Sequence, residues 1–476
     1  MDYTIEAERG RAPLPPSKRL WGFWEYTWAN AALAVATWGF LIGGSLALVA
    51  DVKNGLLAIA TGNIMGVLLV GLAVSISAGK YGVEQYTFMR SAFGHNGSRL
   101  IYFVAVILLT VGWLVVLGIM FGRSIDSAWS AATHHDANPS GWHIYLIAVL
   151  AIVITAFVVA RGPTSIKVFN TVVAPALVLI MGLMLYLFLR DSSVAELVAL
   201  DALAKPSDSD AVNFMIAVEI NIAAGFSWWP YLGNLSRITN SERVAFWPNL
   251  LGIGLAASLG EAVGMLGAIK YGNADPTQWM AESGGLWLGV VVLLFVAFAN
   301  VTSMANILYT AVVGLRQMFH AVLKTLSWER LVMGFCAVAV VVMFLIPGLY
   351  DGFLTFLVWG AALYSALTGV MIVDYFLLRR QRVALKDLFI EGKASTYYFT
   401  GGFNLASMLA VVMGPVLYSI TFNPLTFAHT GYFRFTTASV LTTIAAGVVY
   451  WIFSHPLTLS RGLGGYANFR RAPRHR

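Results

Sequence analysis

The sequence between residues 219 and 234 reads EINIAAGFSWWPYLGN, an apolar run that is interrupted near its centre. Pro230 removes a backbone donor and clashes with the preceding turn, so a helix that enters this stretch is expected to break. Gly225 and Gly233 also permit unusual dihedral angles. Interrupted membrane helices expose backbone groups that can coordinate ions and substrates. The stretch therefore predicts a discontinuous membrane helix beside a binding site.

A related pattern lies near the N-terminus, where the segment 30–44 carries Gly39, Gly43 and Gly44. If the two segments are the first and sixth membrane helices, they occupy corresponding places in two five-helix halves, as an inverted repeat requires. Glycines in membrane helices also serve close packing between helices, and this alternative explains the pattern equally well.

The whole composition is that of a membrane protein. Of its 476 residues, 58% are hydrophobic and 11% are charged, whereas a soluble domain carries about 25% charged residues. A spanning helix needs about 20 mostly apolar residues. Runs of this kind lie at 24–49, 54–78, 100–122, 142–160, 167–189, 211–232, 245–269, 285–313, 330–347, 352–376, 401–421 and 435–454. The sequence predicts an all-α membrane protein with twelve transmembrane helices.

Basic residues gather in alternate connections between these runs. The connection 79–99 contains Lys80, Arg90 and Arg99, whereas the next one contains Arg123 alone. Because basic residues bias a loop toward the cytoplasm, we expect a multi-pass protein of the cell membrane with both termini cytoplasmic. The net charge of +7 is then a topology signal, and it does not indicate nucleic acid binding.

No connection is long enough to hide a soluble catalytic domain. The longest, such as 190–210 and 377–400, have about twenty residues, and no phosphate-binding loop of the Walker type occurs. We therefore expect neither an enzyme nor an ATP-driven pump.

Polar residues form a stripe in the eighth apolar run. Asn300, Ser303 and Asn306 share one helical face, and Thr302 lies four positions before Asn306. Their oxygens suit a hard monovalent cation, and a carboxamide suits paired hydrogen bonds with the edge of a heterocycle. Hydrogen bonding between helices is the alternative.

Two acidic residues, Glu219 and Glu261, lie inside apolar runs. A charge at the bilayer centre costs about 2.5–3.5 kcal/mol on insertion scales, so an intramembrane acid is a functional candidate by default. Both residues are predicted to take part in proton coupling. The alternative is a neutral carboxyl that is hydrogen-bonded to a neighbouring helix.

The end of the tenth run, residues 369–382, reads GVMIVDYFLLRRQR, and the next loop begins VALKDLF at residue 383. Both resemble the corresponding segments of the nucleobase–cation symporter-1 family, whose members include cytosine, purine, uracil, hydantoin and allantoin permeases. The segment Asn306–Tyr309 resembles the eighth helix of cytosine permeases.

This resemblance implies a core of ten helices in two inverted repeats, with discontinuous helices 1 and 6, plus two peripheral helices. The expected parts are a cytoplasmic N-terminal tail (1–23), the first repeat (24–189), the second repeat (211–376), the peripheral helices (401–454) and a basic cytoplasmic tail (455–476).

The resemblance also implies the site. Substrate is expected between helices 1, 3, 6 and 8, stacked on Trp113, with Asn306 reading the polar edge of the ring. The sixth-helix aromatic aligns near Gly225, so Phe226 and Trp229 are the candidates for the second ring face. A sodium site is expected from the carbonyls of Ala32 and Val35 and from side chains among Asn300, Thr302 and Ser303.

We therefore expect a secondary active, cation-coupled symporter that imports a small planar nitrogen heterocycle by alternating access. No cofactor is expected beyond sodium or a proton as coupling ion. The expected partners are the substrate and the lipid bilayer, and no obligate protein partner is implied. The alternative is a proton-coupled carrier of another small ring compound, such as a vitamin precursor, or of an amino acid.

Overall fold

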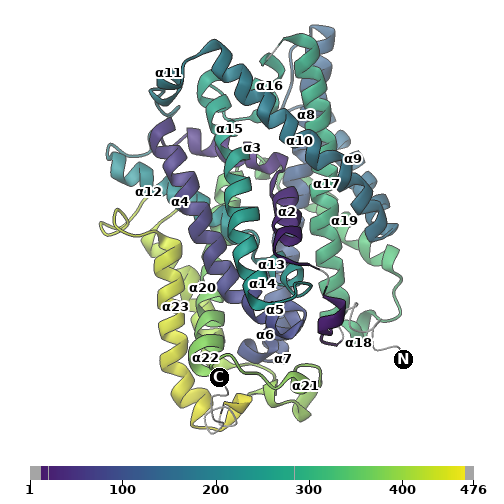
Figure 1. The fold of residues 1–476 in the computed structure, drawn as a ribbon, viewed down its shortest axis with the longest axis vertical. Helices are drawn as coiled ribbons and strands as arrows, with labels where there is room; N and C mark the ends of the chain where they lie inside the picture. The colour runs from purple at the N-terminus through teal and green to yellow at the C-terminus, as the bar shows by residue number, and fades with distance from the viewer. Residues whose placement is uncertain (1–11, 20, 284, 467–476) are drawn as a thin grey trace.

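The computed structural model describes residues 12–19, 21–283 and 285–466. Across these residues the regular structure is helical, and extended residues pair only in isolated bridges such as that between Trp21 and Thr239. The predicted all-α class is confirmed. Figure 1 shows most of the long helices running roughly along the longest axis of the molecule.

The first half of the described chain contains η1 (Pro16–Lys18), α2 (Phe23–Ala34), α3 (Thr37–Ala47), α4 (Val52–Val70), η2 (Gly71–Ser75), α5 (Ile76–Tyr81), α6 (Gln85–Phe93), α7 (His95–Ile101), η3 (Tyr102–Leu108), α8 (Leu109–Thr133), α9 (Trp142–Ala160), α10 (Pro163–Asp191), α11 (Val194–Val198), α12 (Asp210–Phe226) and α13 (Trp229–Ser236). Of these, η2 and η3 are π-helical turns that continue the long helices around them.

The second half contains α14 (Glu242–Asn249), η4 (Leu250–Leu255), α15 (Ala256–Tyr271), α16 (Pro276–Glu282), α17 (Leu286–Met318), α18 (His320–Leu323), α19 (Trp328–Leu345), η5 (Pro347–Leu349), α20 (Phe353–Ile372), η6 (Val373–Leu378), α21 (Leu385–Leu388), η7 (Gly392–Ala394), η8 (Thr396–Tyr398), α22 (Leu405–Thr421), α23 (Ala438–Ser454), η9 (His455–Leu459) and η10 (Leu463–Gly465).

Each predicted span coincides with a helix or a bent helix pair. Among the described residues, 8 helices are long and apolar enough to cross a membrane, and two bent pairs raise this number to 10. Two shorter apolar helices, Pro175–Arg190 and Leu405–Thr421, fall in the two remaining predicted spans. The exact number of crossings stays a prediction.

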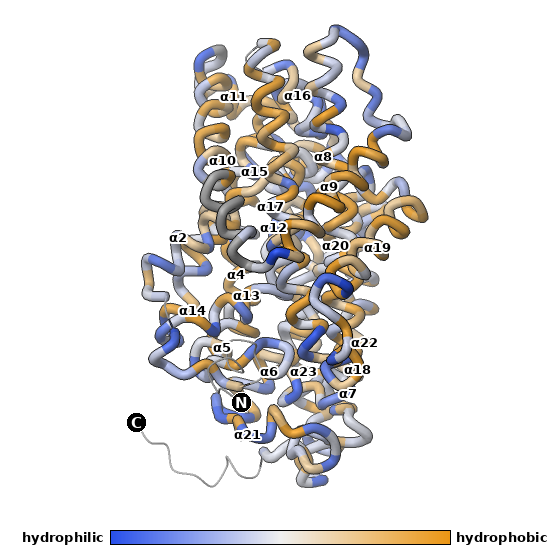
Figure 2. The backbone as a smooth tube through the Cα atoms, turned by 90° about the vertical axis from the view of Figure 1, so that its right-hand side faces the viewer, coloured by the Kyte–Doolittle hydropathy of each residue, from blue (hydrophilic) through white to orange (hydrophobic). Residues whose placement is uncertain are grey.

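The outer faces of the helices are apolar. Phe157 in α9, Leu179 in α10 and Val416 in α22 are 58%, 74% and 57% exposed. Figure 2 shows long hydrophobic stretches along α9 and α19. Large exposed apolar surface is rare on soluble monomers and marks a partner or a membrane. Lipid is the environment that fits such side chains on many helices at once.

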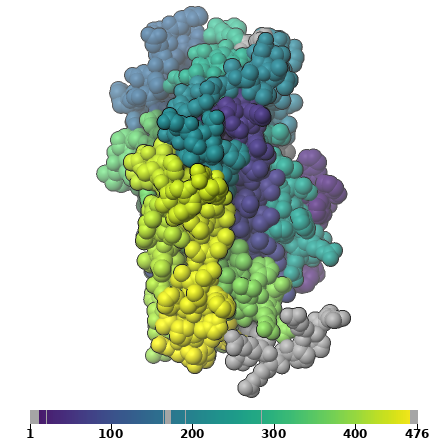
Figure 3. Space-filling model, turned by 90° about the vertical axis from the view of Figure 1, so that its left-hand side faces the viewer, coloured from purple at the N-terminus to yellow at the C-terminus, as the bar shows by residue number. Residues whose placement is uncertain are grey.

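The helices pack in pairs that are distant in sequence. The helix α17 lies against α8, α12 lies against α4, and α15 lies against α3, while α22 and α23 pack on α20. In Figure 3 the C-terminal part of the chain, drawn in yellow, forms one edge of the molecule. Residues at the breaks of the two bent pairs line a common cavity with residues of α8 and α17.

Candidate functional site

The first break separates α2 from α3, which are bent by 61°. Val35 and Ala36 lie between them with non-helical dihedral angles. The predicted glycines lie beyond the break, inside α3, and they serve close packing. A Cβ on Gly43 would lie 2.1 Å from the carbonyl oxygen of Glu261. Gly43 therefore allows close packing between helices, which was the alternative interpretation of these glycines. The break itself falls at Val35 and Ala36.

The second break separates α12 from α13, which are bent by 46° at Ser227 and Trp228. Pro230 lies in the first turn of α13, where its missing N–H has no intrahelical partner to lose. Gly225 allows α12 to approach α4, because a Cβ there would lie 2.8 Å from the Cα of Gly66. Pro230 thus belongs to the first turn of the second half-helix, α13, and Gly225 allows the first half-helix, α12, to pack closely on α4.

A cavity lies between the two breaks. Its empty space is about 870 Å³, part of which is open to solvent. Its described lining consists of Ala32, Leu33, Val35, Ala36, Trp38, Trp113, Val173, Leu177, Ser227, Trp228, Tyr231, Leu235, Ala299, Thr302, Ser303, Asn306, Ile307 and Thr310. None of these lining residues carries a charged side chain.

Six of the predicted site residues meet at this cavity. Trp113 comes from α8, while Thr302, Ser303 and Asn306 come from α17. Ala32 and Val35 belong to the end of α2 and the break that follows it. Trp113 packs edge-on against Phe353 and Phe356 of α20, with ring centroids 5.4 and 5.9 Å apart, so its indole is held in place.

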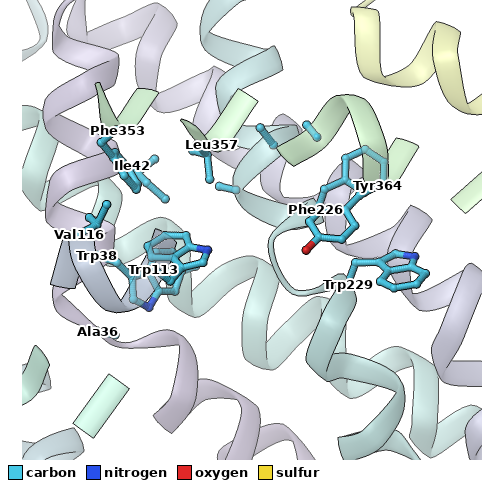
Figure 4. Close-up of a cluster of buried hydrophobic side chains, with 14 of the residues drawn as sticks. Ala36, Trp38, Ile42, Trp113, Val116, Phe226, Trp229, Phe353, Leu357 and Tyr364 are labelled. Atoms are coloured by element: carbon cyan, nitrogen blue, oxygen red, sulfur yellow. The ribbon is translucent and has the colours of Figure 1, made fainter. Parts of the chain in front are cut away.

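The remaining predicted aromatics lie elsewhere. Phe226 and Trp229 are fully buried and are not among the described lining residues. Trp229 stacks on Tyr364 of α20, with centroids 5.5 Å apart and an interplanar angle of 23°. Figure 4 shows Trp229, Phe226 and Tyr364 as one group, apart from Trp38 and Trp113. Gly225 packs against α4, as described above.

Two other tryptophans occupy the cavity wall instead. Trp228 and Trp38 meet edge to face with centroids 6.0 Å apart, and Tyr231 lies one turn further along α13. Phe226 and Trp229 were the candidates because the family resemblance aligns the sixth-helix aromatic near Gly225. The bend at Ser227 and Trp228 determines which aromatic side chain lines the cavity. The sequence does show two adjacent tryptophans here, Trp228 and Trp229, but it does not show which of them faces the cavity.

Asn300 connects two helices beside the cavity. Its Oδ1 accepts a hydrogen bond from Thr37 at 2.5 Å, and its Nδ2 donates to the carbonyl of Val296 at 3.0 Å. By contrast, Asn306 faces the cavity while its Nδ2 donates to the carbonyl of Thr302 at 2.9 Å. Within the predicted polar stripe, Asn300 therefore makes a contact between two helices, whereas Asn306 lines the cavity.

The two intramembrane acids lie away from the cavity wall. Glu219 of α12 accepts hydrogen bonds from Tyr418 of α22 and from Ser439 of α23. Glu261 of α15 accepts a hydrogen bond from Asn63 of α4 at 2.7 Å. Both carboxyl groups are fully buried.

Comparison with known proteins places these features in one family. The family described as "Permease for cytosine/purines, uracil, thiamine, allantoin" matches residues 13–447. A purine-uracil permease of Arabidopsis thaliana is 23% identical, covering 92% of this chain and 76% of its own. The cytosine permease of Escherichia coli K12 is 26% identical, covering 78% and 81%.

Solved structures show the same fold. The inward-facing conformation of Mhp1 superposes with a TM-score of 0.76 at 19% identity and covers 97% of both chains. A closed conformation of Mhp1 with bromovinylhydantoin bound gives a TM-score of 0.72, also at 19% identity. The family match extends from the first bent pair to the last long helix, and so this chain, a multi-pass membrane transporter and not an enzyme, belongs to the family of permeases for cytosine and purines, uracil, thiamine and allantoin.

Proposed function

We propose that this permease carries a small, neutral, planar nitrogen heterocycle of the nucleobase type, together with a cation, across the cell membrane by alternating access. The cavity between the two helix breaks would open in turn to each side. We place both termini in the cytoplasm on the basis of the loop charges. The two bent pairs, one in 24–189 and one in 211–376, support an inverted repeat, with 401–454 as peripheral helices.

The observation that carries this proposal is the chemistry of the cavity wall. The described lining offers indole rings, hydroxyls and one carboxamide, and no charged side chain. A zwitterionic amino acid would leave its charges unpaired in such a site, at a large cost in desolvation. A neutral flat ring loses little hydration and gains stacking, so the heterocycle is favoured over the amino acid alternative.

Each part of the wall has a proposed role. Trp113, fixed by the two phenylalanines of α20, supplies one stacking surface, and Trp228 supplies the other in place of Phe226 and Trp229. Asn306 reads the edge of the ring, because a carboxamide can both donate and accept. Stacking of a base on an aromatic residue contributes about 1–3 kcal/mol.

A sodium ion is one candidate for the coupled cation. The last carbonyls of a helix lack intrahelical partners, so those of Ala32 and Val35 can serve as ligands opposite the hydroxyls of Thr302 and Ser303. Asn300 is the least suitable of the predicted sodium ligands, because its Oδ1 already accepts a hydrogen bond from Thr37. A proton taken up by Glu219 or Glu261 is the other candidate.

The test is uptake into proteoliposomes that contain the purified chain. Radiolabelled cytosine, uracil, hypoxanthine, allantoin and hydantoin are offered without a gradient, then under separate sodium and pH gradients. We expect exchange and gradient-driven accumulation of at least one. Trp113→Ala should abolish saturable uptake, while Trp129→Ala is the matched control, because Trp129 lies on the same helix and is 67% exposed. If verified vesicles exchange none of the five compounds, the proposed substrate class is wrong.

A further inference from the structure

The two buried acids differ in the number of donors they receive. The carboxylate of Glu219 accepts from the hydroxyl of Tyr418 at 2.6 Å and from both the backbone N–H and the hydroxyl of Ser439, at 3.0 and 2.5 Å. Both oxygens of the Glu219 carboxyl group therefore have hydrogen-bond partners. Glu219 therefore works as a fixed acceptor that ties α12 to α22 and α23.

Glu261 has a much poorer environment. Its Oε2 accepts one hydrogen bond from Nδ2 of Asn63 at 2.7 Å, while its Oε1 is buried and has no hydrogen-bond partner among the described residues. A buried carboxylate with one unpartnered oxygen loses the full hydration of that oxygen, which is far more costly than burying a neutral carboxyl group. The site suits a carboxyl that holds a proton on Oε1.

No described charge compensates Glu261. The elements packed on α15 are α2, α3, α4, η4, α10 and α16, and α3 and η4 contain no titratable residue. The other elements, with α15 itself, contribute Glu25, Tyr26, Lys53, Lys167, Tyr186, Arg190, Asp191, Glu282, Lys270 and Tyr271. The interaction described for the Glu261 side chain is the one with Asn63.

The position of Glu261 connects it to the first break. A Cβ on Gly39 would lie 3.5 Å from the backbone nitrogen of Glu261, and a Cβ on Gly43 would lie 2.1 Å from its carbonyl oxygen. The helix α3 that carries these glycines begins one residue after Ala36, which lines the cavity. Glu261 therefore lies where α15 packs on α3, and α3 is the half-helix that begins at the edge of the cavity.

We propose that Glu261, positioned by Asn63, is the proton-binding site through which transport is coupled to a proton gradient. One proton adds to Oε1 from the side of higher proton concentration, and the neutral carboxyl carries it through the conformational change. The same O–H bond breaks on the other side and returns the carboxylate. This inference rests on the proposed function, because it assigns the coupling ion of that same carrier.

The experiment uses the full-length protein in proteoliposomes and a substrate that the wild type exchanges. Three readouts are taken for the wild type, Glu261→Gln, Glu261→Asp and Glu219→Gln: exchange without a gradient, accumulation under a pH gradient, and internal acidification with a trapped dye. At one proton per substrate, a gradient of one pH unit drives about tenfold accumulation. We expect Glu261→Gln to keep exchange but lose accumulation and acidification, and Glu261→Asp to keep all three with a shifted pH profile.

Several results would overturn the assignment. Proton-driven accumulation that persists in Glu261→Gln removes Glu261 as the carrier, and loss of coupling in Glu219→Gln alone transfers the role to Glu219. Accumulation by the wild type under a sodium gradient but not under a pH gradient would show that the coupling ion is sodium and not a proton. A wild type that exchanges no heterocycle contradicts the proposed function instead, so the two failures are distinguishable. Asn63→Ala adds an independent check, because loss of its donor favours the protonated form and should move the uptake profile to higher pH.

Discussion

Thr37 donates a hydrogen bond to Asn300 across 2.5 Å, and this contact joins the first residue of α3 to the middle of α17. Both side chains are fully buried. The next residue, Trp38, lines the cavity, so the bond fixes the start of the half-helix that carries it.

Thr37→Val should leave Oδ1 of Asn300 buried without this donor, which costs about 1–3 kcal/mol. We expect a lower melting temperature in detergent and slower exchange of substrate. Thr37→Ser keeps the hydroxyl and is the control, and it should behave like the wild type. Equal melting temperatures for the valine and serine variants would show that the bond contributes nothing measurable.

Replacing Trp228 should weaken substrate binding more than replacing Phe226. Trp228 lines the cavity, whereas Phe226 is fully buried and is not among the described lining residues. Loss of a stacking surface worth about 1–3 kcal/mol corresponds to a rise in Kd of about five- to 150-fold. Equilibrium binding of the transported heterocycle to Trp228→Ala and Phe226→Leu measures this directly. A larger rise in Kd for Phe226→Leu would return the stacking role to the residue that the sequence favoured.

Gly43→Ala should destabilise the protein, because the added methyl group would lie 2.1 Å from a backbone oxygen of α15. Backbone atoms cannot rotate away as a flexible side chain can, and such overpacking costs about 1–3 kcal/mol or more. The control is Gly182→Ala in α10, where nothing lies within 4 Å of the new atom. Thermal unfolding followed by a fluorescent thiol probe on Cys336, buried in the native state, should report a loss for the first variant only.

Substitutions of Asp374 and Arg379, which form a buried ion pair, should have strongly non-additive effects on stability. The guanidinium donates to Asp374 at 2.8 Å and to the carbonyls of Ser91 and Gly464, and it is fully buried. Arg379→Met leaves the carboxylate uncompensated, which costs about 3–5 kcal/mol.

The double variant Asp374→Asn with Arg379→Met should recover part of this loss, because neither partner is then a buried unpaired charge. Melting temperatures of the wild type, both single variants and the double variant form the cycle. Strictly additive losses would contradict a direct interaction.

Glu84, outside the spans, should make stability depend on pH. Burial raises the pKa of its carboxyl group above the usual value, and the hydrogen bond from Thr87 and the charge of Arg237 offset this only in part. The folded protein therefore keeps a proton that the unfolded chain releases, so stability falls as pH rises above about 4.5. Glu84→Gln cannot titrate, so its melting temperature should fall less between pH 4 and pH 8. Parallel curves would show that Glu84 does not titrate in this window.

The sequence by itself determined where the helices lie and that the sixth is interrupted beside Pro230, whereas the break in the first falls at Val35 and Ala36 and not at the predicted glycines. These features follow from local properties, namely runs of apolar residues long enough for a bilayer and a proline that suits the first turn of a new helix. The residues 369–382 also identified the family, and Asp374 and Arg379 within them hold distant segments together. Trp113 was named through the family resemblance. Asn306 was named through that resemblance and through the polar stripe of the eighth span, an unbroken helix on which spacing predicts a face.

Only the tertiary structure decided which residues meet at the cavity and what each buried acid can do. A bend of 46° between α12 and α13 turns Trp228 inward and leaves Trp229 against Tyr364, and no helical periodicity extends across such a bend. Glu219 and Glu261 look alike in sequence, but their donors come from residues 199, 220 and 198 positions away. The charge state of a buried carboxyl depends on those partners, and partners so distant are brought together only by the fold.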